Sequence, residues 1–463
     1  MPLPTPIGRQ KDVLYLPGSG HTVVLGSAGS GKTTLAILRA AYLAHPKTAN
    51  GGRTLLVTFN RSLTTFLQQY AGHELSNVTV ENYHKFARGY LNSRGILGYG
   101  TICEGKRRDD LIRDAIRSVQ SARSSPIFAK GFEFVASEIE WIQQHGIRTP
   151  DQYHEEQRTN RDGTRLDQPS CRTVLEVIAA YKAGREAAGK KYDWNDIATA
   201  VSAALDQDHS PRRYKHVIID EGQDFSPEMI RSLAKAVSTN GSVTFFGDMA
   251  QQIYGRRMSW KSAGLKVSKV WEFKDNYRNT SQIARLGLEI SKMPFFRETP
   301  DMVEPTTPKA DGPLPALVEC SSTAREFTFT RERVNAIAKS QTVAVITRTW
   351  TLADRVAKYL PKGSIRLDHD LSTWQSGPGV YYGTFHGAKG LEFDTVILPF
   401  CSSAVLPDPG VVRTLGQGEA DATDGKLLYV GVTRAKTGLI MTHTGPRTSL
   451  LPSTSGLYQM AKA

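Results

Sequence analysis

The stretch Gly26-Ser27-Ala28-Gly29-Ser30-Gly31-Lys32-Thr33 has the spacing G-x-x-x-x-G-K-[ST]. Thr22–Leu25 before it is predicted as a short buried strand, and Thr34–Ala44 after it as a helix. In that setting the glycines let successive backbone N–H groups point inward, and the helix N-terminus adds a partial positive charge. The stretch therefore predicts a nucleoside triphosphate site in which Lys32 reaches the β- and γ-phosphates and Thr33 coordinates Mg²⁺. The alternative, a glycine-rich turn that matches by chance, is disfavoured by the complete match and its strand–helix context.

Length and composition are those of a globular protein with several domains. The chain has 463 residues, of which 40% are hydrophobic and 22% charged, so we expect about two to four domains with real cores. The formal net charge is +13. This excess favours a polyanionic partner, with nucleic acid as the first expectation and an acidic membrane surface as the second. The alternative is that the positive net charge does not reflect any specific partner.

Cysteine spacing and hydropathy limit the kinds of metal site, cellular compartment and membrane segment that we expect. The four cysteines are far apart and form no C-x-x-C pair, which gives zinc and iron–sulfur sites little support and fits a reducing compartment. They are Cys103, Cys171, Cys320 and Cys401. No apolar run reaches the length of a membrane span, and Met1–Lys11 lacks the apolar core of a signal peptide. We therefore expect a cytoplasmic protein without membrane contact.

Apolar, β-branched runs alternate with helical patterns in two parts of the chain, which predicts an α/β fold with two parallel-sheet domains. The strands expected in the first are Thr22–Leu25, Arg53–Phe59, Val78–Val80, His216–Ile219, Ser242–Phe246 and Val267–Phe273. Those expected in the second are Thr342–Thr347, Val380–Phe385, Thr395–Leu398 and Gly438–Thr444, with a helix at Leu352–Leu360. Pro294–Pro315 has the composition of a surface connection.

Helical periodicity interrupts the first of these domains. It covers Arg107–Arg123, Gly131–Gly146 and Arg172–Gly189, with a polar stretch at His154–Ser170. We therefore predict a first sheet domain from residues 1–84 and 191–272, a helical insertion at 85–190, and a second sheet domain at 273–463.

The polar residues of interest mostly follow predicted strands, where open parallel sheets bind their ligands. Asp220 suits a second Mg²⁺-holding residue, and Glu221 is a candidate base for an attacking water; a helix cap or solvated turn is the alternative for the pair. Gln251 is placed to donate to a γ-phosphate. Arg278 and Arg434 are candidates for the arginine that meets developing charge in phosphoryl transfer.

Seven ordered motifs between Gly26 and Lys436 resemble the superfamily 1 helicases of the UvrD/Rep/PcrA type. They are GSAGSGKT, LLVTFNRSL, DEGQD, GDMAQQIYGRR, NYRN, TFHGAKGLEF and LLYVGVTRAK. The resemblance implies two RecA-like motor domains with a 1B-like helical insertion, ATP and Mg²⁺ at their interface, and single-stranded DNA as partner, with RNA as a weaker alternative.

The resemblance also implies residue roles. Gln10 is similar to the glutamine that recognises adenine, Tyr277 to the residue that stacks on it, and Glu392 to the carboxylate that contacts the ribose. Lys32, Thr33 and Asp220 would hold Mg·ATP, and Gln251, Arg278 and Arg434 would surround the γ-phosphate. The residues implied in a single-strand channel are Phe59, Asn60, His84, Tyr254, Thr384 and His386. Ordinary core packing is the alternative for Tyr254.

Three departures from the family pattern affect these expectations. Arg256 stands where an aromatic residue is frequent, although a guanidinium also stacks on bases. Thr34 stands where an arginine often contacts phosphate. Arg348 and Thr384 are 36 positions apart, which is too short for the 2B subdomain that larger members insert there.

Two functions remain open from the sequence. The first is a DNA-stimulated ATPase that translocates on single-stranded DNA, 3′ to 5′ by resemblance, and unwinds duplexes. The second is a nucleotide-gated, DNA-sensing regulatory subunit that controls a partner such as a nuclease and unwinds little by itself. A P-loop kinase would leave the basic charge and the later motifs unexplained.

Overall fold

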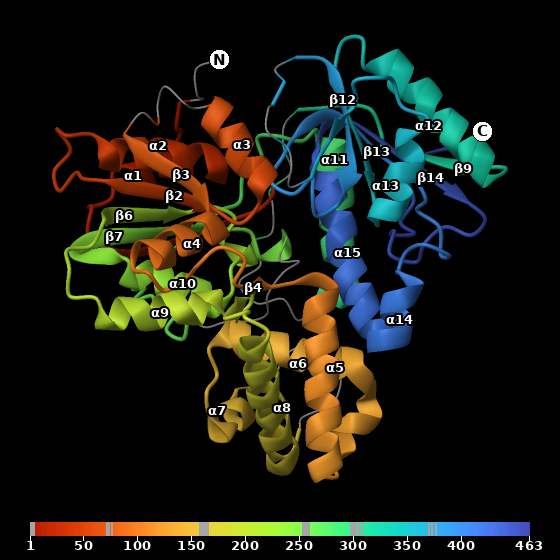
Figure 1. Cartoon of the computed structure of the whole chain (residues 1–463). Helices are drawn as coiled ribbons and strands as arrows, with labels where there is room; N and C mark the ends of the chain where they lie inside the picture. The colour runs from red at the N-terminus through yellow and green to blue at the C-terminus, as the bar shows by residue number, and fades with distance from the viewer. Residues whose placement is uncertain are drawn as a thin grey trace.

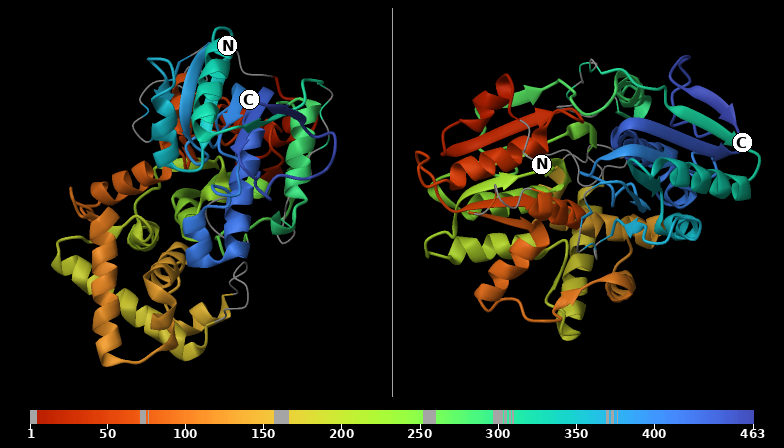
Figure 2. Two further views of the ribbon diagram at one scale, coloured as in Figure 1. Left: turned by 90° about the vertical axis from the view of Figure 1, so that its right-hand side faces the viewer. Right: turned by 90° about the horizontal axis from the view of Figure 1, so that it is seen from above.

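The computed structural model describes residues 5–70, 75, 77–156, 166–251, 260–296, 303, 306, 308, 310–368, 371, 374–375 and 377–463. Two parallel sheets flanked by helices lie side by side, and a group of helices extends below them (Figures 1 and 2). We call the sheets with their helices the first and second lobes. This arrangement confirms the predicted α/β fold with two RecA-like parallel sheets.

The first lobe contains a six-stranded parallel sheet in the order β3-β2-β6-β7-β1-β8. Its strands are β1 (Gly20–Gly26), β2 (Thr54–Thr58), β3 (Val78–Asn82), β6 (Tyr214–Ile219), β7 (Val237–Gly247) and β8 (Val270–Phe273). Alternate residues of each strand point to opposite faces, so Leu56 and Ile218 enter one core while Val57 and Ile219 enter another. Both faces are therefore buried, as expected for a parallel sheet.

Helices cover both faces of this sheet. One core includes residues of α1 (Arg9–Leu14), α2 (Lys32–Ala44) and α3 (Arg61–Tyr70). The other includes residues of α4 (Tyr83–Ser93), α9 (Ile197–Gln207) and α10 (Pro227–Lys235). Side-chain caps fix where several of them begin. Asn82 Oδ1 accepts from Lys85 N–H at 2.9 Å at the start of α4, and Asn60 Oδ1 accepts from Ser62 N–H at 2.8 Å at the start of α3.

The second lobe contains a seven-stranded parallel sheet in the order β11-β12-β10-β13-β14-β9-β15. Its strands are β9 (Ala316–Cys320), β10 (Thr342–Thr347), β11 (Ile365–Arg366), β12 (Gly379–Thr384), β13 (Phe393–Leu398), β14 (Ala435–Thr444) and β15 (Gln459–Lys462). Its helices are α11 (Ser281–Ser291), α12 (Thr323–Ile337), α13 (Trp350–Ala357), α14 (Pro409–Leu415) and α15 (Gln417–Thr433). Between Arg348 and Thr384, the described residues form only α13, β11 and β12.

The lower group of helices has a core of its own, which includes Ile112, Ile139, Val174 and Tyr181. We call it the helical group. It consists of α5 (Gly105–Ala122), η1 (Pro126–Lys130), α6 (Gly131–His145), α7 (Pro150–Glu155) and α8 (Gln168–Ala187). The short strands β4 (Ile102–Cys103) and β5 (Tyr192–Asp193) pair where the chain enters and leaves it. Within the described ranges, no helix is both long and apolar enough for a bilayer crossing.

Side chains at the carboxyl ends of the first sheet point toward the second lobe. The second lobe meets them chiefly with the connection between β12 and β13, residues 385–392, and with the C-terminal end of α15. Arg434 is the C-cap of α15 and precedes β14. Arg434 therefore departs from the expectation that polar site residues follow strands, whereas His386 and Glu392 follow β12 as expected.

Candidate active site between the two lobes

The Gly26–Thr33 loop curls around the ammonium group of Lys32. Gly29 and Gly31 have φ angles of 77° and 81°, a left-handed conformation that glycine adopts at little cost. Lys32 Nζ donates to the carbonyls of Gly26 at 2.9 Å and Ser27 at 2.7 Å, and to Ser30 Oγ at 3.5 Å. The backbone of the loop thus lies close around the Lys32 ammonium group. A bound phosphate could replace the two carbonyls as the partner of this cation.

Neighbouring segments hold the rest of this loop. Ser27 N–H donates to Phe273 O at 3.1 Å, and the backbone of Ala28 forms a hydrogen bond with the Tyr429 hydroxyl of the second lobe. Thr33 and Thr34 are half-buried in the first turn of α2. Burial lowers the pKa of Lys32, while the carboxylate of Asp248, with Oδ2 3.8 Å from Lys32 Nζ, opposes that shift.

The end of β6 carries two adjacent carboxylates. Asp220 is 1% exposed, and its Oδ2 has no hydrogen-bond partner among the described residues. Its carboxyl group forms a hydrogen bond with the Thr33 hydroxyl. Burial first, and then the charge of Glu221, raise the pKa of Asp220 above its usual range. An unpartnered buried carboxylate oxygen beside a hydroxyl fits a hard divalent cation such as Mg²⁺, which takes oxygen ligands and relieves this repulsion.

Glu221 has a left-handed φ of 52° and accepts a hydrogen bond from Gln223 Nε2 at 2.5 Å. Burial favours its neutral form, but the cations Lys389, Arg434 and Lys32 outweigh burial and hold the pKa of Glu221 below its ordinary value. Glu221 is therefore a carboxylate near neutral pH, as a proton acceptor must be.

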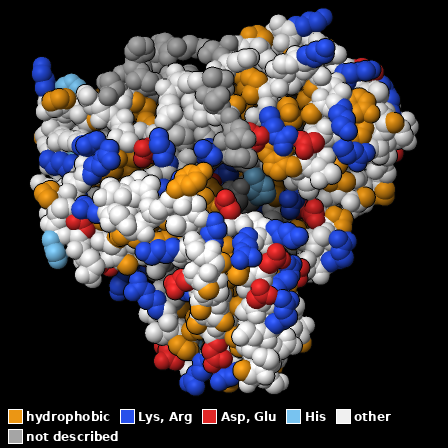
Figure 3. All heavy atoms as spheres, viewed as in Figure 1, with side chains coloured by type: hydrophobic (Ala, Val, Ile, Leu, Met, Phe, Trp, Pro, Cys, Tyr) orange, Lys and Arg blue, Asp and Glu red, His pale blue; other side chains and the backbone are white. Residues whose placement is uncertain are grey.

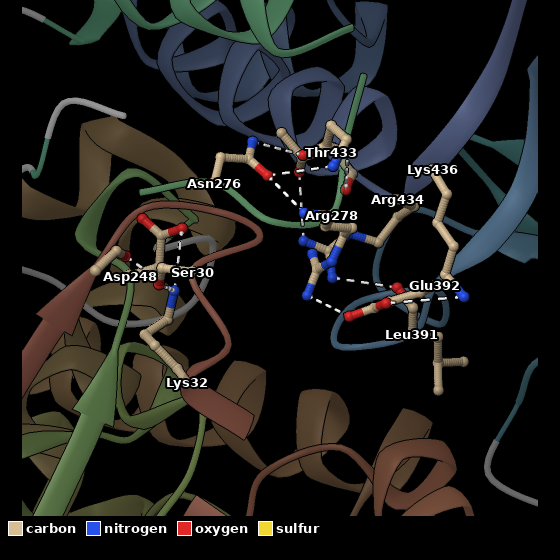
Figure 4. Close-up of polar contacts among 12 residues, drawn as sticks. Ser30, Lys32, Asp248, Asn276, Arg278, Leu391, Glu392, Thr433, Arg434 and Lys436 are labelled. Atoms are coloured by element: carbon tan, nitrogen blue, oxygen red, sulfur yellow. Dashed lines mark hydrogen bonds and ion pairs between the residues drawn. The ribbon is translucent and has the colours of Figure 1, made fainter. Parts of the chain in front are cut away.

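A row of polar contacts crosses from the first lobe to the second. Gln251 Nε2 donates to Asp248 Oδ2 at 2.8 Å, and Gln251 Oε1 accepts from Arg434 Nη2 at 2.7 Å. Arg434 is 1% exposed, and its pKa is lowered to about 10, chiefly by burial and then by the charge of Arg278. Figure 4 shows Lys32 and Asp248 on one side of the interface and Arg434 on the other. The row brings the predicted residues Lys32, Gln251 and Arg434 into one site.

Arg278 and Glu392 form an ion pair beside this row, with Nη2 and Oε1 2.5 Å apart (Figure 4). Lys436 Nζ lies 4.0 Å from the other Glu392 oxygen. Asn276 Oδ1 accepts from the Arg278 backbone N–H at 3.0 Å, which fixes the turn after β8. Two of the predicted nucleotide residues thus contact each other directly.

The residues expected around adenine lie against the outer side of the loop. Gln10 Nε2 donates to Ser30 O at 3.0 Å, and its Oε1 accepts from Ile7 N–H at 3.1 Å. Tyr277 N–H donates to Gly29 O at 2.9 Å. Tyr277 is 56% exposed, and an exposed aromatic residue beside a phosphate loop offers a surface on which a base can stack.

The residues expected in the strand channel gather at the same interface. His84 packs edge-on against Phe59, with ring centroids 5.8 Å apart, in the first lobe. Asn60 Nδ2 donates across the lobes to Lys389 O at 3.0 Å and to His386 O at 3.4 Å. Thr384 Oγ1 accepts from Gly387 N–H at 3.2 Å. Tyr254 and Arg256 lie outside the described residues.

Both histidines of this set are neutral near pH 7. Burial lowers the pKa of His84 to about 4, with a smaller effect from Arg61. Burial, and then Arg348 and Lys389, lower the pKa of His386 to about 4. These side chains therefore offer ring faces and neutral hydrogen-bonding atoms rather than positive charge.

The sequence assigned no role to three residues at the centre of the site, Asp248, Asp224 and Lys389. Lys389 Nζ donates to Asp224 Oδ1 at 2.5 Å and to the Gln251 carbonyl, and both charged side chains are 2% exposed. Lys389 lies in the TFHGAKGLEF motif and Asp224 in DEGQD. The sequence does show that the two motifs carry opposite charges. It does not show that these two residues, 165 positions apart, contact each other.

Comparison with known proteins agrees with this geometry. The family model for the UvrD/REP helicase N-terminal domain matches residues 8–270, and that for the UvrD-like helicase C-terminal domain matches residues 367–445. DNA helicase IV of Escherichia coli K12 is 21% identical over 90% of this chain and 65% of its own length. ATP-dependent DNA helicase UvrD2 of Mycobacterium bovis is 25% identical over 69% of this chain and 48% of its own length.

A probable DNA helicase of Mycoplasma pneumoniae is 20% identical over 91% of this chain and 80% of its own length. The solved C-terminal domain of a possible DNA helicase from Lactobacillus plantarum WCFS1 covers 40% of this chain and 98% of its own, with 21% identity and a TM-score of 0.29. The chain thus spans less than two thirds of the first two relatives. Because the N-terminal model alone covers more than half of the residues, the chain belongs to the UvrD/REP helicase family.

Proposed function

We propose that this chain hydrolyses ATP between its two lobes and uses the cycle to move along single-stranded DNA. The row of contacts from Lys32 through Asp248 and Gln251 to Arg434 carries this proposal, because it joins the phosphate loop to an arginine of the other lobe. A γ-phosphate within this row would contact both lobes at once, and its loss would remove that link. Such differential contact is what lets a ligand shift a conformational equilibrium.

In this proposal the nucleotide is held by residues from both lobes. The loop Gly26–Lys32 binds the phosphates, Gln10 and Tyr277 hold the adenine, and Glu392 contacts the ribose once Arg278 turns toward the phosphates. Glu221 accepts a proton from the attacking water. Arg278 and Arg434 stabilise the charge that develops on the transferred phosphoryl group, an effect worth about 10³–10⁵ in rate.

Thr33 and Asp220 are the residues that would hold Mg²⁺. The unpartnered Asp220 oxygen and the Thr33 hydroxyl beside it support this assignment. When bound, the ion neutralises charge on the phosphate oxygens. The Thr33 hydroxyl also forms a hydrogen bond with the Asp220 carboxyl group and so orients it.

The strand would lie along the channel formed by Phe59, Asn60, His84, Thr384 and His386. Their neutral rings, amide and hydroxyl groups suit base stacking, which is worth about 1–3 kcal/mol per base and tolerates any sequence. Figure 3 shows Lys and Arg side chains, with Asp and Glu side chains among them, around the place where the lobes and the helical group meet. The cations among them could contact the phosphate backbone. The names of the relatives favour DNA over RNA, and the family resemblance favours 3′-to-5′ movement.

We also propose that the chain is divided as the sequence predicts. Residues 1–84 and 191–272 would form one motor domain, 273–463 the other, and 85–190 a 1B-like insertion. The separate core of the helical group supports the insertion. The short described segment between Arg348 and Thr384 supports a compact form without a 2B subdomain.

Turnover with and without nucleic acid tests the function. ATP hydrolysis is measured alone and with single-stranded DNA, duplex DNA and RNA, for wild type, Glu221→Gln and the exposed control Glu186→Gln. We expect stimulation chiefly by single-stranded DNA, its loss in Glu221→Gln, and unchanged turnover in Glu186→Gln. A wild-type protein that single-stranded DNA does not stimulate contradicts the proposal.

Strand displacement from duplexes with a 3′ or a 5′ single-stranded tail tests polarity and unwinding. We expect displacement from the 3′-tailed duplex. Displacement from the 5′-tailed duplex alone refutes the polarity. Stimulated turnover without displacement leaves a translocase, and would favour the DNA-sensing regulatory role over a helicase.

A further inference from the structure

Lys389 lies in the interface between the two lobes. It belongs to the connection after β12, yet its side chain is only 2% exposed because the first lobe covers it. The next residue, Gly390, has a left-handed φ of 81°, and a Cβ there would come within 2.8 Å of Leu63 in α3. The connection therefore fits against the first lobe without room for an added methyl group.

Three loops of the first lobe contact Lys389. Its ammonium group donates to Asp224, which follows β6, and to the Gln251 carbonyl, which follows β7. Its own carbonyl accepts from Asn60, which follows β2. Among the described residues, Lys389 thus joins the loop after the paired carboxylates, the loop with Gln251, and the start of α3.

These contacts reach both halves of the interface. Gln251 is held through its carbonyl by Lys389 while its side chain contacts Arg434 and Asp248 on the nucleotide side. Asn60 caps α3 through Oδ1 and contacts Lys389 through Nδ2 on the strand side. A shift of Lys389 relative to the first lobe would therefore move contacts in both places.

The charges make this contact sensitive to lobe separation. A buried ammonium is tolerated only with a close carboxylate and further hydrogen bonds, which Asp224 and Gln251 supply. Separating the partners inside the interface leaves both charges unpaired, so intermediate distances are unfavourable until water enters. The pair favours two discrete arrangements, closed and open, over a continuous range.

We propose that Lys389 is a positioning residue that couples the nucleotide site to the strand channel. Its ammonium group fixes the Gln251 loop and its carbonyl fixes Asn60. Both contacts cross from one lobe to the other, so separation of the lobes would break both. The inference rests on the proposed function, because it assumes that one side binds ATP and the other a single strand. It adds a specific residue through which binding on one side affects the other.

Linkage between the two ligands tests the proposal. The Kd for an oligo(dT) strand is measured with and without a non-hydrolysable ATP analogue, for wild type, Lys389→Met and Lys462→Met. Methionine keeps the chain length and removes the charge, and Lys462 is an exposed lysine of β15 far from the site. Thermal unfolding of each protein shows whether it is folded.

We expect the analogue to change the wild-type Kd about 5- to 150-fold, the usual range of coupling between sites. Lys462→Met keeps this factor. Lys389→Met reduces it to within about twofold of unity, while the Kd for each ligand alone changes less than about threefold, because Lys389 contacts neither ligand. The stimulation of turnover by single-stranded DNA, expressed relative to the DNA-free turnover of the same protein, falls in parallel.

The double variant Lys389→Met/Asp224→Asn separates coupling from stability. Removing Lys389 leaves a buried carboxylate unpaired, which destabilises the first lobe, and Asp224→Asn removes that charge. We expect the unfolding midpoint to recover in the double variant while the coupling factor stays near unity. Recovery of wild-type coupling would show that Lys389 only neutralises Asp224 and would overturn the proposal.

Two further outcomes are decisive. A Lys389→Met protein that keeps the wild-type coupling factor overturns the inference and leaves the proposed function intact. A wild-type protein that binds neither the analogue nor oligo(dT) overturns the proposed function, and the inference with it.

Discussion

The nucleotide half and the strand half of the lobe interface differ in charge. The nucleotide half contains buried carboxylates of the first lobe facing a cation of the second, for example Asp248 and Glu221 opposite Arg434. The strand half offers rings, amides and hydroxyls, and its two histidines are neutral near pH 7. A small polyanion is best held by fixed charges, whereas a strand of any sequence is best held by stacking.

The difference also has a mechanical consequence. Buried unlike charges on two lobes attract strongly over short distances and leave costly unpaired charges when separated. Neutral stacking surfaces lose less when they slide or part. The nucleotide half is therefore the part of the interface that sets closure, and the strand half is the part that can exchange one base for the next.

The largest expected effect comes from removing the cation of the nucleotide half. Arg434→Gln keeps a hydrogen-bond donor near Gln251 but removes the charge that meets the phosphoryl group. We expect kcat for DNA-stimulated hydrolysis to fall about 10³–10⁵-fold, with a much smaller change in the Kd of the ATP analogue. Steady-state kinetics with equilibrium binding measures both. A loss confined to nucleotide affinity would contradict the assigned role.

A smaller effect is expected from crowding the phosphate loop. A Cβ on Gly29 would lie 2.1 Å from Asn276 Oδ1 and 2.9 Å from Arg278 Cβ. Gly29→Ala should therefore displace the loop and weaken binding of the ATP analogue about tenfold or more.

Gly95→Ala is the matched control for this change. Gly95 also has a left-handed φ, of 66°, but an added Cβ meets nothing within 4 Å. Both variants place an alanine at a left-handed φ, so the difference between them reports chiefly the clash at the loop. Equal nucleotide affinity in the two variants would show that the Asn276 contact is not part of the site.

The smallest expected effect concerns a neutral histidine of the strand half. The folded-state pKa of His386 is about 4, below the 6.5 of an ordinary histidine. Between these values the unfolded chain binds a proton that the folded chain does not, so this histidine costs stability as the pH falls from about 6.5 toward 4. His386→Gln removes that contribution.

We therefore expect wild type to lose about 1 kcal/mol more unfolding free energy than His386→Gln between pH 7 and pH 5, a discounted value because His386 is only half-buried. Urea denaturation at both pH values measures the difference. The exposed His209→Gln should follow wild type. If His386→Gln also follows wild type, folding does not lower the pKa of His386, and the contrast between the halves weakens.

Much of the fold could be predicted from local patterns. The apolar runs around Leu56, Ile218 and Val345 are β-strands, and all lie inside buried parallel sheets. Strand β9 and helices α12 and α15 were not among the predicted elements. α15 is buried from Leu427 to Thr433 on most of its surface, so it lacks the amphipathic period that marks a surface helix.

The candidate site could be predicted where its contacts lie within a single motif. The Gly26–Thr33 loop closes on Lys32 through contacts within a few residues, which its spacing already implies. The partners of Arg278 and Lys389 were not predictable. Their partners Glu392 and Asp224 lie far from them along the chain, so no local pattern pairs them, and the buried Lys389–Asp224 contact also depends on how the lobes dock.

The sequence by itself determined the α/β class, the phosphate loop and the order of the motifs, because glycine conformation, strand periodicity and loop spacing are local properties of the chain. Only the tertiary structure decided that Arg434 contacts Gln251 and that Lys389 contacts Asp224 and Asn60. Those contacts join surfaces of two separate cores, and the free energy of burying opposite charges belongs to the docked lobes rather than to either segment.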